Sequence, residues 1–187
     1  MLWRCLFVFL LALIVLPAQA ADEPAASPLT AKLIAKKDTY TLAADQQGEA
    51  FRKKLADPKS GEVYMPPAVD LILELTNPTD KPITIKVGAD SGGLDLELKG
   101  PGAISISPRI AMTREFRGGK PQEIAAGATF EIPIAKLSYG MRGVSKQAFW
   151  TEPGEYALGV SYRYPGNDRT ISKVTAEPIK VTVEAAK

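Results

Sequence analysis

The chain has 187 residues, 45% of them hydrophobic, and carries 23 basic against 21 acidic side chains for a net charge of +2. A chain so close to neutral lacks the basic surface of nucleic-acid-binding proteins, so no nucleic-acid partner is expected. The sequence contains no histidine and a single cysteine, Cys5. This composition excludes Ser-His-Asp and Cys-His hydrolases, HExxH zinc sites and histidine-ligated copper centres.

The first twenty residues have the pattern of a secretory signal peptide. Arg4 precedes an unbroken apolar run from Leu6 to Leu16, Pro17 ends the run, and Ala18-Gln19-Ala20 is a small-x-small cleavage motif. An uncleaved membrane anchor is the alternative, but eleven apolar residues fall well short of the ~20 that a membrane-spanning helix needs. We therefore expect removal of residues 1–20 on export, leaving a periplasmic or extracellular protein without cysteine, cofactor, metal or membrane insertion.

Residues 21–28 are small, polar or proline, and we expect a flexible leader there. Residues 29–187 are predicted to form a single domain. A chain of this length can bury a self-sufficient apolar core, so disulfide bonds are not needed for its stability.

From Leu29 the apolar residues Leu29, Ala31, Leu33 and Ala35 recur with the two-residue period of a β-strand, and we expect this strand to continue through Tyr40 and Leu42. Residues 43–67 interrupt the pattern, and Phe51 and Leu55 stand four positions apart, the spacing of one helical face. A short helix or an ordered loop is therefore predicted within this insertion.

The clearest strand is VDLILELT at 69–76, followed by the turn-forming segment NPTDKP and by ITIKV at 83–87. This order predicts a hairpin between the two strands. Glycine or proline bounds each of the further predicted strands, which span 94–98, 103–107, 110–116, 128–135, 155–164, 170–175 and 179–184.

Short connections with almost no helical pattern require antiparallel pairing, because parallel crossovers need a dozen or more residues. About nine or ten short strands with one apolar side each can bury these sides best when they form two sheets packed face to face. The predicted fold is all-β, an antiparallel immunoglobulin-like β-sandwich with a short helical or loop insertion. A partly closed barrel is the alternative.

Three segments resemble the immunoglobulin-like domains of exported bacterial proteins, in the same order along the chain. They are LELTNPTDKPITIKV at 73–87, AAGATFEIPI at 125–134 and WTEPGEYALGVSY at 150–162. The residues that carry the match are Asn77, Gly127, Pro153, Gly154 and Tyr156. The chain also resembles the intracellular proteinase inhibitor-like family, whose members are similar β-sandwiches. The resemblance implies a strand-turn-strand unit, a glycine turn that opens a strand, and a proline-glycine corner feeding a late strand whose tyrosine helps to close the sandwich.

Carboxylates are the one catalytic option that the composition leaves. Asp95 and Glu97 lie on one face of a predicted strand, about 6.6 Å apart by the strand rise, within the range of a glycosidase pair. With Asp90 in ADSGGLD they also form a candidate calcium loop. Their alternation with Leu94, Leu96 and Leu98 is more typical of the solvent-facing side of a strand, which is the interpretation that we favour.

Two other segments are candidate binding surfaces. The first gathers Arg109, Arg114, Arg117 and Lys120, with Glu115 among them, and is suited to an acidic polysaccharide or an anionic cell surface. The second is the connection from Tyr139 to Pro153, which holds Met141, Arg142, Phe149 and Trp150, a composition common at protein interfaces.

Trp150 and Tyr156 also have a structural interpretation. A large indole is usually mostly buried, so Trp150 is expected to fill the sandwich interior. The hydroxyl of Tyr156 is expected to bond back to the backbone near the corner that precedes it.

The sequence thus predicts a non-catalytic exported binding or structural module that contacts a protein or a cell-surface macromolecule through its loops. The alternative is a carbohydrate-active or calcium-dependent protein that uses Asp90, Asp95 and Glu97. A binding module acting through its loops is the stronger expectation, because of how sites are distributed on sandwich folds.

Overall fold

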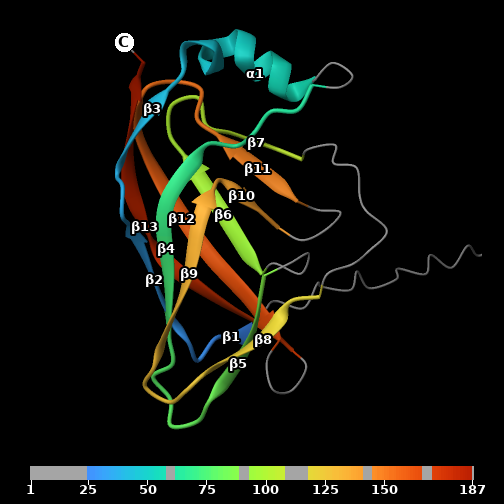
Figure 1. Ribbon diagram of the computed structural model, residues 1–187, viewed down its shortest axis with the longest axis vertical. Helices are drawn as coiled ribbons and strands as arrows, with labels where there is room; N and C mark the ends of the chain where they lie inside the picture. Colours follow the sequence, from blue (N-terminus) through green and yellow to red (C-terminus); the bar gives the residue numbers. More distant parts are fainter. Residues whose placement is uncertain are drawn as a thin grey trace, which may run out of the picture.

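The computed structural model describes residues 25–57, 62–88, 93–107, 118–140, 145–165 and 170–186. They contain one α-helix, α1 (Gly48–Ala56), one 3-10 helix, η1 (Ala44–Gln46), and thirteen strands (Figure 1). The strands are β1 (Ala25–Ala26), β2 (Thr30–Ala35), β3 (Thr39–Leu42), β4 (Ala68–Thr76), β5 (Ile83–Val87), β6 (Leu94–Lys99), β7 (Ile104–Ile106), β8 (Lys120–Ile124), β9 (Thr129–Lys136), β10 (Ser138–Tyr139), β11 (Lys146–Phe149), β12 (Gly154–Pro165) and β13 (Ile171–Ala185). The predicted signal peptide at 1–20 and the predicted strand at 110–116 lie outside the described residues.

Two layers of strands face each other, which confirms the predicted all-β sandwich (Figure 1). One layer has the order β1-β13-β12-β6, with β3 also paired to β13, and the other has the order β2-β4-β9. The small sheet β10-β11-β7 adjoins β6, because the Gly140 amide donates a 3.0 Å hydrogen bond to the Leu94 carbonyl. The β5-β8 pair lies at the lower end of the molecule in Figure 1.

Alternation of residue types places one side of each long strand in the core. On β4 the inward residues are leucines and a valine, and on β12 they are three tyrosines, a leucine and a valine. The inward side chains of these two strands, all buried, are Val69, Leu71, Leu73, Leu75, Tyr156, Leu158, Val160, Tyr162 and Tyr164. Removal of this apolar surface from water is the main force that holds the layers together.

The predicted single strand at 29–42 is wrong, because it consists of two strands in different layers. β2 pairs with β4, whereas β3 pairs with β13. Leu33, Tyr40 and Leu42 are nevertheless all buried. The buried position is odd-numbered in β2, and the buried positions are even-numbered in β3. The alternation therefore changes phase between the two strands, and the prediction of a single strand overlooked this break. The pairing of β3 with β13 is parallel, as is that of β1 with β13, while the other pairs are antiparallel.

The predicted hairpin between 69–76 and 83–87 is also wrong. β4 pairs with β2 and β9, and β5 pairs with β8. The turn after β4 exists, but fully buried Asn77 holds it by donating side-chain hydrogen bonds to the carbonyls of Lys81, Ile124 and Ala125. These bonds tie the turn to the end of β8, so the chain leaves β4 for a different partner.

The predicted flexible leader at 21–28 is wrong for its last residues. Ala25 and Ala26 form β1, which pairs with Ser172 and Lys173 of β13. The hydroxyls of Ser27 and Tyr164 then share a 2.6 Å hydrogen bond. The chain is therefore attached to the sandwich before the first long strand begins.

The predicted strands at 170–175 and 179–184 are one continuous strand, β13. Between its pairing partners Ala176 and Ile179, β13 has two residues, Glu177 and Pro178, opposite the single residue Gly159 of β12. This is a β-bulge, a position that tolerates proline because no ladder hydrogen bond is required there.

The predicted helical insertion is confirmed. Phe51 and Leu55 of α1 are buried and pack with Phe149 at the upper end of the sandwich in Figure 1. Arg52 links the helix to the corner before β12, because its guanidinium pairs with Glu152 and donates to the Thr151 hydroxyl. None of the helices in the described part of the chain has the length and apolar character needed to span a membrane.

Candidate functional site

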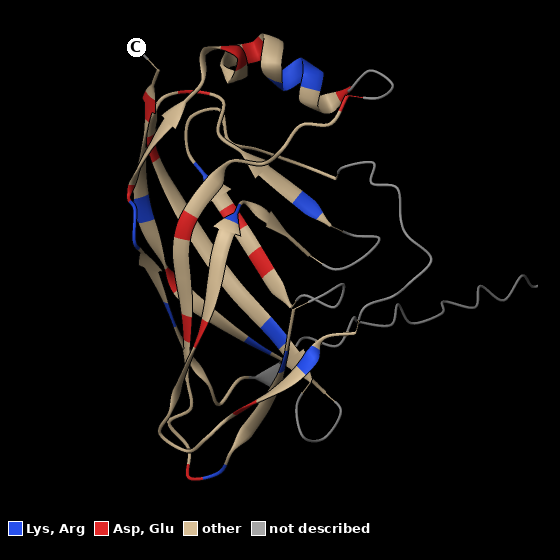
Figure 2. Cartoon of the chain, viewed as in Figure 1, with Lys and Arg blue, Asp and Glu red and all other residues tan. Residues whose placement is uncertain are grey.

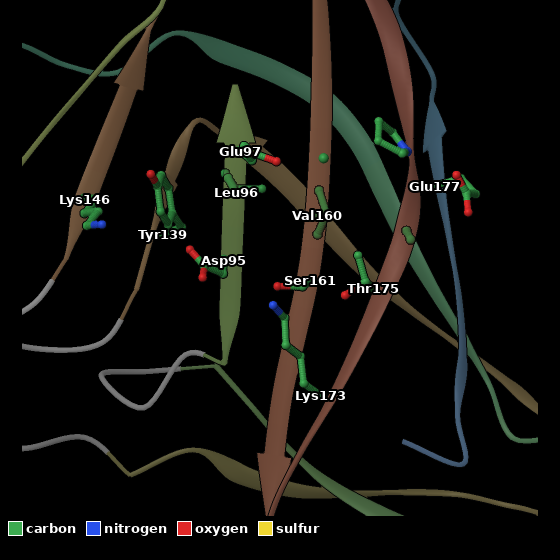
Figure 3. A pocket seen from close by; sticks show the side chains of 13 residues that line it. Asp95, Leu96, Glu97, Tyr139, Lys146, Val160, Ser161, Lys173, Thr175 and Glu177 are labelled. Atoms are coloured by element: carbon green, nitrogen blue, oxygen red, sulfur yellow. The ribbon is translucent and has the colours of Figure 1, made fainter. Parts of the chain in front are cut away.

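A trough of about 570 Å³ lies on the outer face of the β13-β12-β6 sheet (Figure 3). Gly159 and Ser161 of β12 lie along its floor. Asp95 and Glu97 of β6 flank one side, with Tyr139 and Lys146 beyond them, and Lys173, Thr175 and Glu177 of β13 flank the other (Figure 3). We call this feature the β12 trough.

The sequence of β12 explains why the trough is there. Its inward residues are large, whereas its outward residues around the trough are Ala157, Gly159 and Ser161. Successive side chains of a strand point to opposite faces, so the middle strand is low on the outer face while its neighbours carry long side chains. The β-bulge at Glu177 and Pro178 lies directly opposite Gly159. Bulges are common beside functional sites because they redirect side chains.

Both signs of charge line the trough. Red segments lie on β6 and a blue segment lies near the end of β12 (Figure 2). Asp95 pairs with Arg163 at 3.3 Å, and Glu97 pairs with Lys99 at 2.8 Å. Within the described ranges, Lys173 has no ion-pair partner, and the same holds for Lys146. The walls therefore offer carboxylate acceptors and ammonium donors at the same time.

The two carboxylates that the sequence singled out are neighbours on the outer face of β6. Asp95 is half-buried and Glu97 exposed, as expected for the solvent-facing side of a strand. Each carboxylate has its own basic partner, Arg163 or Lys99, an arrangement typical of a solvated sheet surface. Asp90 lies outside the described residues, and the described ones contain no group of three or more His, Cys, Asp or Glu side chains that could hold a metal ion.

The basic segment is largely untested by the structure. Arg109, Arg114 and Arg117 lie outside the described residues. Lys120 is the exposed first residue of β8, opposite Val87 of β5.

The candidate binding segment from Tyr139 to Pro153 does not present Phe149 or Trp150 to solvent. This part of the chain contains the end of β10 and all of β11, and Phe149 and Trp150 are only 2% and 3% exposed. The Trp150 ring lies 5.2 Å from that of Tyr40 and 6.0 Å from that of Tyr156, measured between centroids. Trp150 therefore fills the interior as expected, while Met141 and Arg142 lie outside the described residues.

The structural role predicted for Tyr156 is confirmed. Its hydroxyl donates to the Glu152 carbonyl at 2.7 Å and also contacts the carbonyl of Pro101. Burial raises the pKa of Tyr156 above its ordinary value, so the hydroxyl remains protonated and available as a donor.

Sequence reasoning missed most of the trough. Gly159, Ser161, Lys173 and Thr175 were not singled out, because each is unremarkable within its own strand. Two signals were present in the sequence: three small outward residues in succession on one strand, and a proline, Pro178, in the middle of another. Together they indicate a row of small side chains on one strand beside a β-bulge in its neighbour.

Comparisons with known proteins identify no family. No family model matches the chain, and no curated protein matches it. Among solved structures, the chain is similar to a crystal structure of native alpha-2-macroglobulin from Escherichia coli that spans the residues from domain MG7 to the C-terminus. The TM-score is 0.40 and the sequence identity 15%, over 86% of this chain and 17% of that chain.

Proposed function

We propose that the protein is an exported, non-catalytic binding module that holds an extended segment of another macromolecule in the β12 trough. The observation that carries this proposal is the trough itself, about 570 Å³ on an otherwise regular sheet face. The predicted signal peptide supports export, and the absence of histidine from the chain supports binding over the common hydrolytic chemistries.

The shape of the trough favours an elongated ligand. The β13 side runs from Lys173, opposite Arg163, to the bulge opposite Gly159, a length of about 13 Å at the rise of roughly 3.3 Å per residue of β12. Its floor is one strand wide, because only β12 lies between β6 and β13. A narrow, open depression of this kind accommodates a chain better than a compact small molecule.

The chemistry of the walls favours a polar ligand. Ammonium groups of Lys146 and Lys173 can donate hydrogen bonds, the carboxylates of Asp95 and Glu97 can accept them, and Ser161 and Thr175 can do either. Hydrogen bonds to charged groups contribute more than neutral ones, about 1.5–3 kcal/mol each when they replace water. Several such bonds along a chain give specific binding without a deep apolar pocket.

Substitution of the trough floor tests the proposal. A Cβ atom added at Gly159 would lie 3.7 Å from the Cβ of Glu97, an ordinary contact, so Gly159→Val is compatible with the strand and fills the floor. Ala157→Val is the matched control, because Ala157 lies on the same strand and the same face but outside the trough. Glycan and peptide arrays would be probed with the mature protein and both variants, alongside thermal melting.

The proposal predicts that ligands retained by the mature protein are also retained by Ala157→Val and lost by Gly159→Val, while all three proteins melt normally. Equal retention by all three proteins would show that the trough is not the binding surface. Release of a chemically altered ligand by the mature protein would overturn the non-catalytic part of the proposal.

A further inference from the structure

We infer that one end of the β12 trough is a subsite for a carboxylate of an acidic polysaccharide, an inference that rests on the proposed function. This basic end is lined by Ser161 of β12 and by Lys173 and Thr175 of β13, and Arg163 of β12 lies beside it, opposite Lys173. The ligand is a sugar chain in which uronate residues are separated by neutral sugars.

The charge arrangement at the basic end is the first observation. Arg163 and Lys173 are directly opposite each other on adjacent antiparallel strands, and both are exposed. Like charges in this position destabilise a sheet, because their Cβ atoms lie only about 4.5–5.5 Å apart. Asp95 pairs with Arg163 at 3.3 Å, but Lys173 has no ion-pair partner among the residues described. One positive charge thus remains uncompensated, and an incoming anion would compensate it.

Two hydroxyls next to these cations are the second observation. Ser161 and Thr175 are also directly opposite each other, one step along the outer face from Arg163 and Lys173. Figure 3 shows the side chain of Lys173 extending toward Ser161, with Thr175 beside them. Ser161 is only 8% exposed, so its hydroxyl lies low at the floor. Two hydroxyls and an ammonium group can donate hydrogen bonds to the two oxygens of a carboxylate.

The opposite charge at the other end of the trough limits the density of negative charge on the ligand. Glu97 and Glu177 line the trough beyond the hydroxyls. A chain with a carboxylate on every unit would place negative charge beside these glutamates. A chain with neutral sugars between its uronates would instead donate hydroxyl hydrogens to them.

The position of the trough on the sheet favours a sugar chain over an acidic peptide. Strand addition, in which an extended peptide gains affinity from main-chain hydrogen bonds, requires an open sheet edge. β12 has no open edge along the trough, because it pairs with β6 on one side and with β13 on the other. Only side chains are available to the ligand, and these match sugar hydroxyls and carboxylates.

Isothermal titration at low ionic strength tests the inference. The probes are a hyaluronan octasaccharide and an oligogalacturonate octamer as acidic sugars, maltooctaose as a neutral sugar, and hexaglutamate as an acidic peptide. The proteins are the mature chain, Lys173→Gln, Asp95→Asn, Gly159→Val and the control Lys180→Gln. Lys180 lies on the same strand and face as Lys173, outside the trough, paired with Glu155 at 2.8 Å.

We expect hyaluronan to bind, with weaker binding of the uniformly charged oligogalacturonate and none of maltooctaose. Lys173→Gln should weaken hyaluronan binding about fivefold, the upper range for one exposed charge pair, and Lys180→Gln should leave it unchanged. Asp95→Asn should strengthen binding about two- to threefold, because it frees Arg163 for the ligand. The effect of Lys173→Gln should shrink in added salt.

The outcomes separate this inference from the proposed function. Loss of binding in Gly159→Val, with equal affinities of Lys173→Gln and Lys180→Gln, would overturn the carboxylate subsite and leave the trough as the binding surface. Weakening by Lys173→Gln without any effect of Gly159→Val would overturn the proposal that the trough is the binding surface and would leave only an anion site at Lys173. Binding of hexaglutamate in preference to both acidic sugars, or binding of none of the acidic probes, would overturn the assignment of an acidic polysaccharide as the ligand.

Discussion

The hydroxyl of Tyr156 donates a 2.7 Å hydrogen bond to the carbonyl oxygen of Glu152, four residues earlier in the chain. The ring of Tyr156 is fully buried, so the bond fixes the corner from which β12 starts. In immunoglobulin-type sandwiches a tyrosine hydroxyl likewise bonds back to the backbone a few residues upstream. Because β12 provides the floor of the trough, this corner also sets the position of the candidate site.

Removal of this hydroxyl should destabilise the fold without creating a cavity in the core. We expect Tyr156→Phe to lower the free energy of unfolding by about 1–2 kcal/mol, since a buried backbone carbonyl loses its donor. Urea denaturation measures the change. Tyr139→Phe is the control, because among the described residues the Tyr139 hydroxyl has a single hydrogen bond, 3.4 Å to the Ser105 hydroxyl. Equal losses in the two variants would contradict the role assigned to Tyr156.

Asn77 should be sensitive to a change that keeps its shape. Its amide donates to three backbone carbonyls, and its carbonyl oxygen accepts from the amide and hydroxyl of Thr79. Asn77→Asp replaces the donor with an acceptor facing three carbonyls, so we expect a loss of about 3 kcal/mol or more at neutral pH, as when a buried polar network is broken. Asn77→Ala should cost less, and the reverse order in chemical denaturation would contradict this account of the turn.

Substitution by alanine should destabilise the fold at one glycine of the trough sheet and have little effect at another. A Cβ atom at Gly93 would lie 1.8 Å from the carbonyl oxygen of Arg163, whereas at Gly159 it meets only ordinary contacts. Gly93→Ala should therefore cost about 2–3 kcal/mol or more through overpacking, and Gly159→Ala should change stability by about 0.5 kcal/mol or less. Thermal melting of both variants checks this, and a tolerated Gly93→Ala would show that the approach of this loop to β12 is wrong.

Alkaline pH should weaken the fold through Tyr162. Burial raises the pKa of Tyr162 from 10.0 to about 12, and its hydroxyl donates to the Lys86 carbonyl. Between these values the unfolded chain releases the proton and the folded chain retains it, so stability falls as pH rises, by roughly 2 kcal/mol in total. Tyr162→Phe should be less stable at pH 8 but lose less stability between pH 10 and 12. Equal slopes in denaturation curves would contradict the assignment, since the lysines titrate in both proteins.

The strand faces could be predicted from the sequence, but their partners could not. Alternation on β4, β6 and β12 identified the buried sides, because burial depends on residue type within one strand. Pairing depends on contacts that are distant in sequence. The side-chain hydrogen bonds of Asn77 that redirect the chain after β4 leave no periodic signal, which is why the predicted hairpin was wrong.

The same distinction explains what was missed at the site. Trp150 and Tyr156 could be assigned structural roles because large aromatic side chains are usually buried, whichever residues they contact. Asp95 and Lys173 are ordinary exposed residues on their own strands, and they form one trough only because β12 lies between them with small residues outward. A site made by three strands side by side becomes visible when the sheet order is known.

Mapping of a bound ligand by amide chemical shifts tests the central claim most directly. The protein without residues 1–20 would be titrated with the hyaluronan octasaccharide, or with any ligand recovered from the arrays, while its backbone amides are followed by NMR. The account predicts that the largest shifts cluster at residues 95–97, 159–161 and 173–178 on the outer face of the β13-β12-β6 sheet. Shifts confined to the β2-β4-β9 face or to the α1 end, with those residues unchanged, would contradict it.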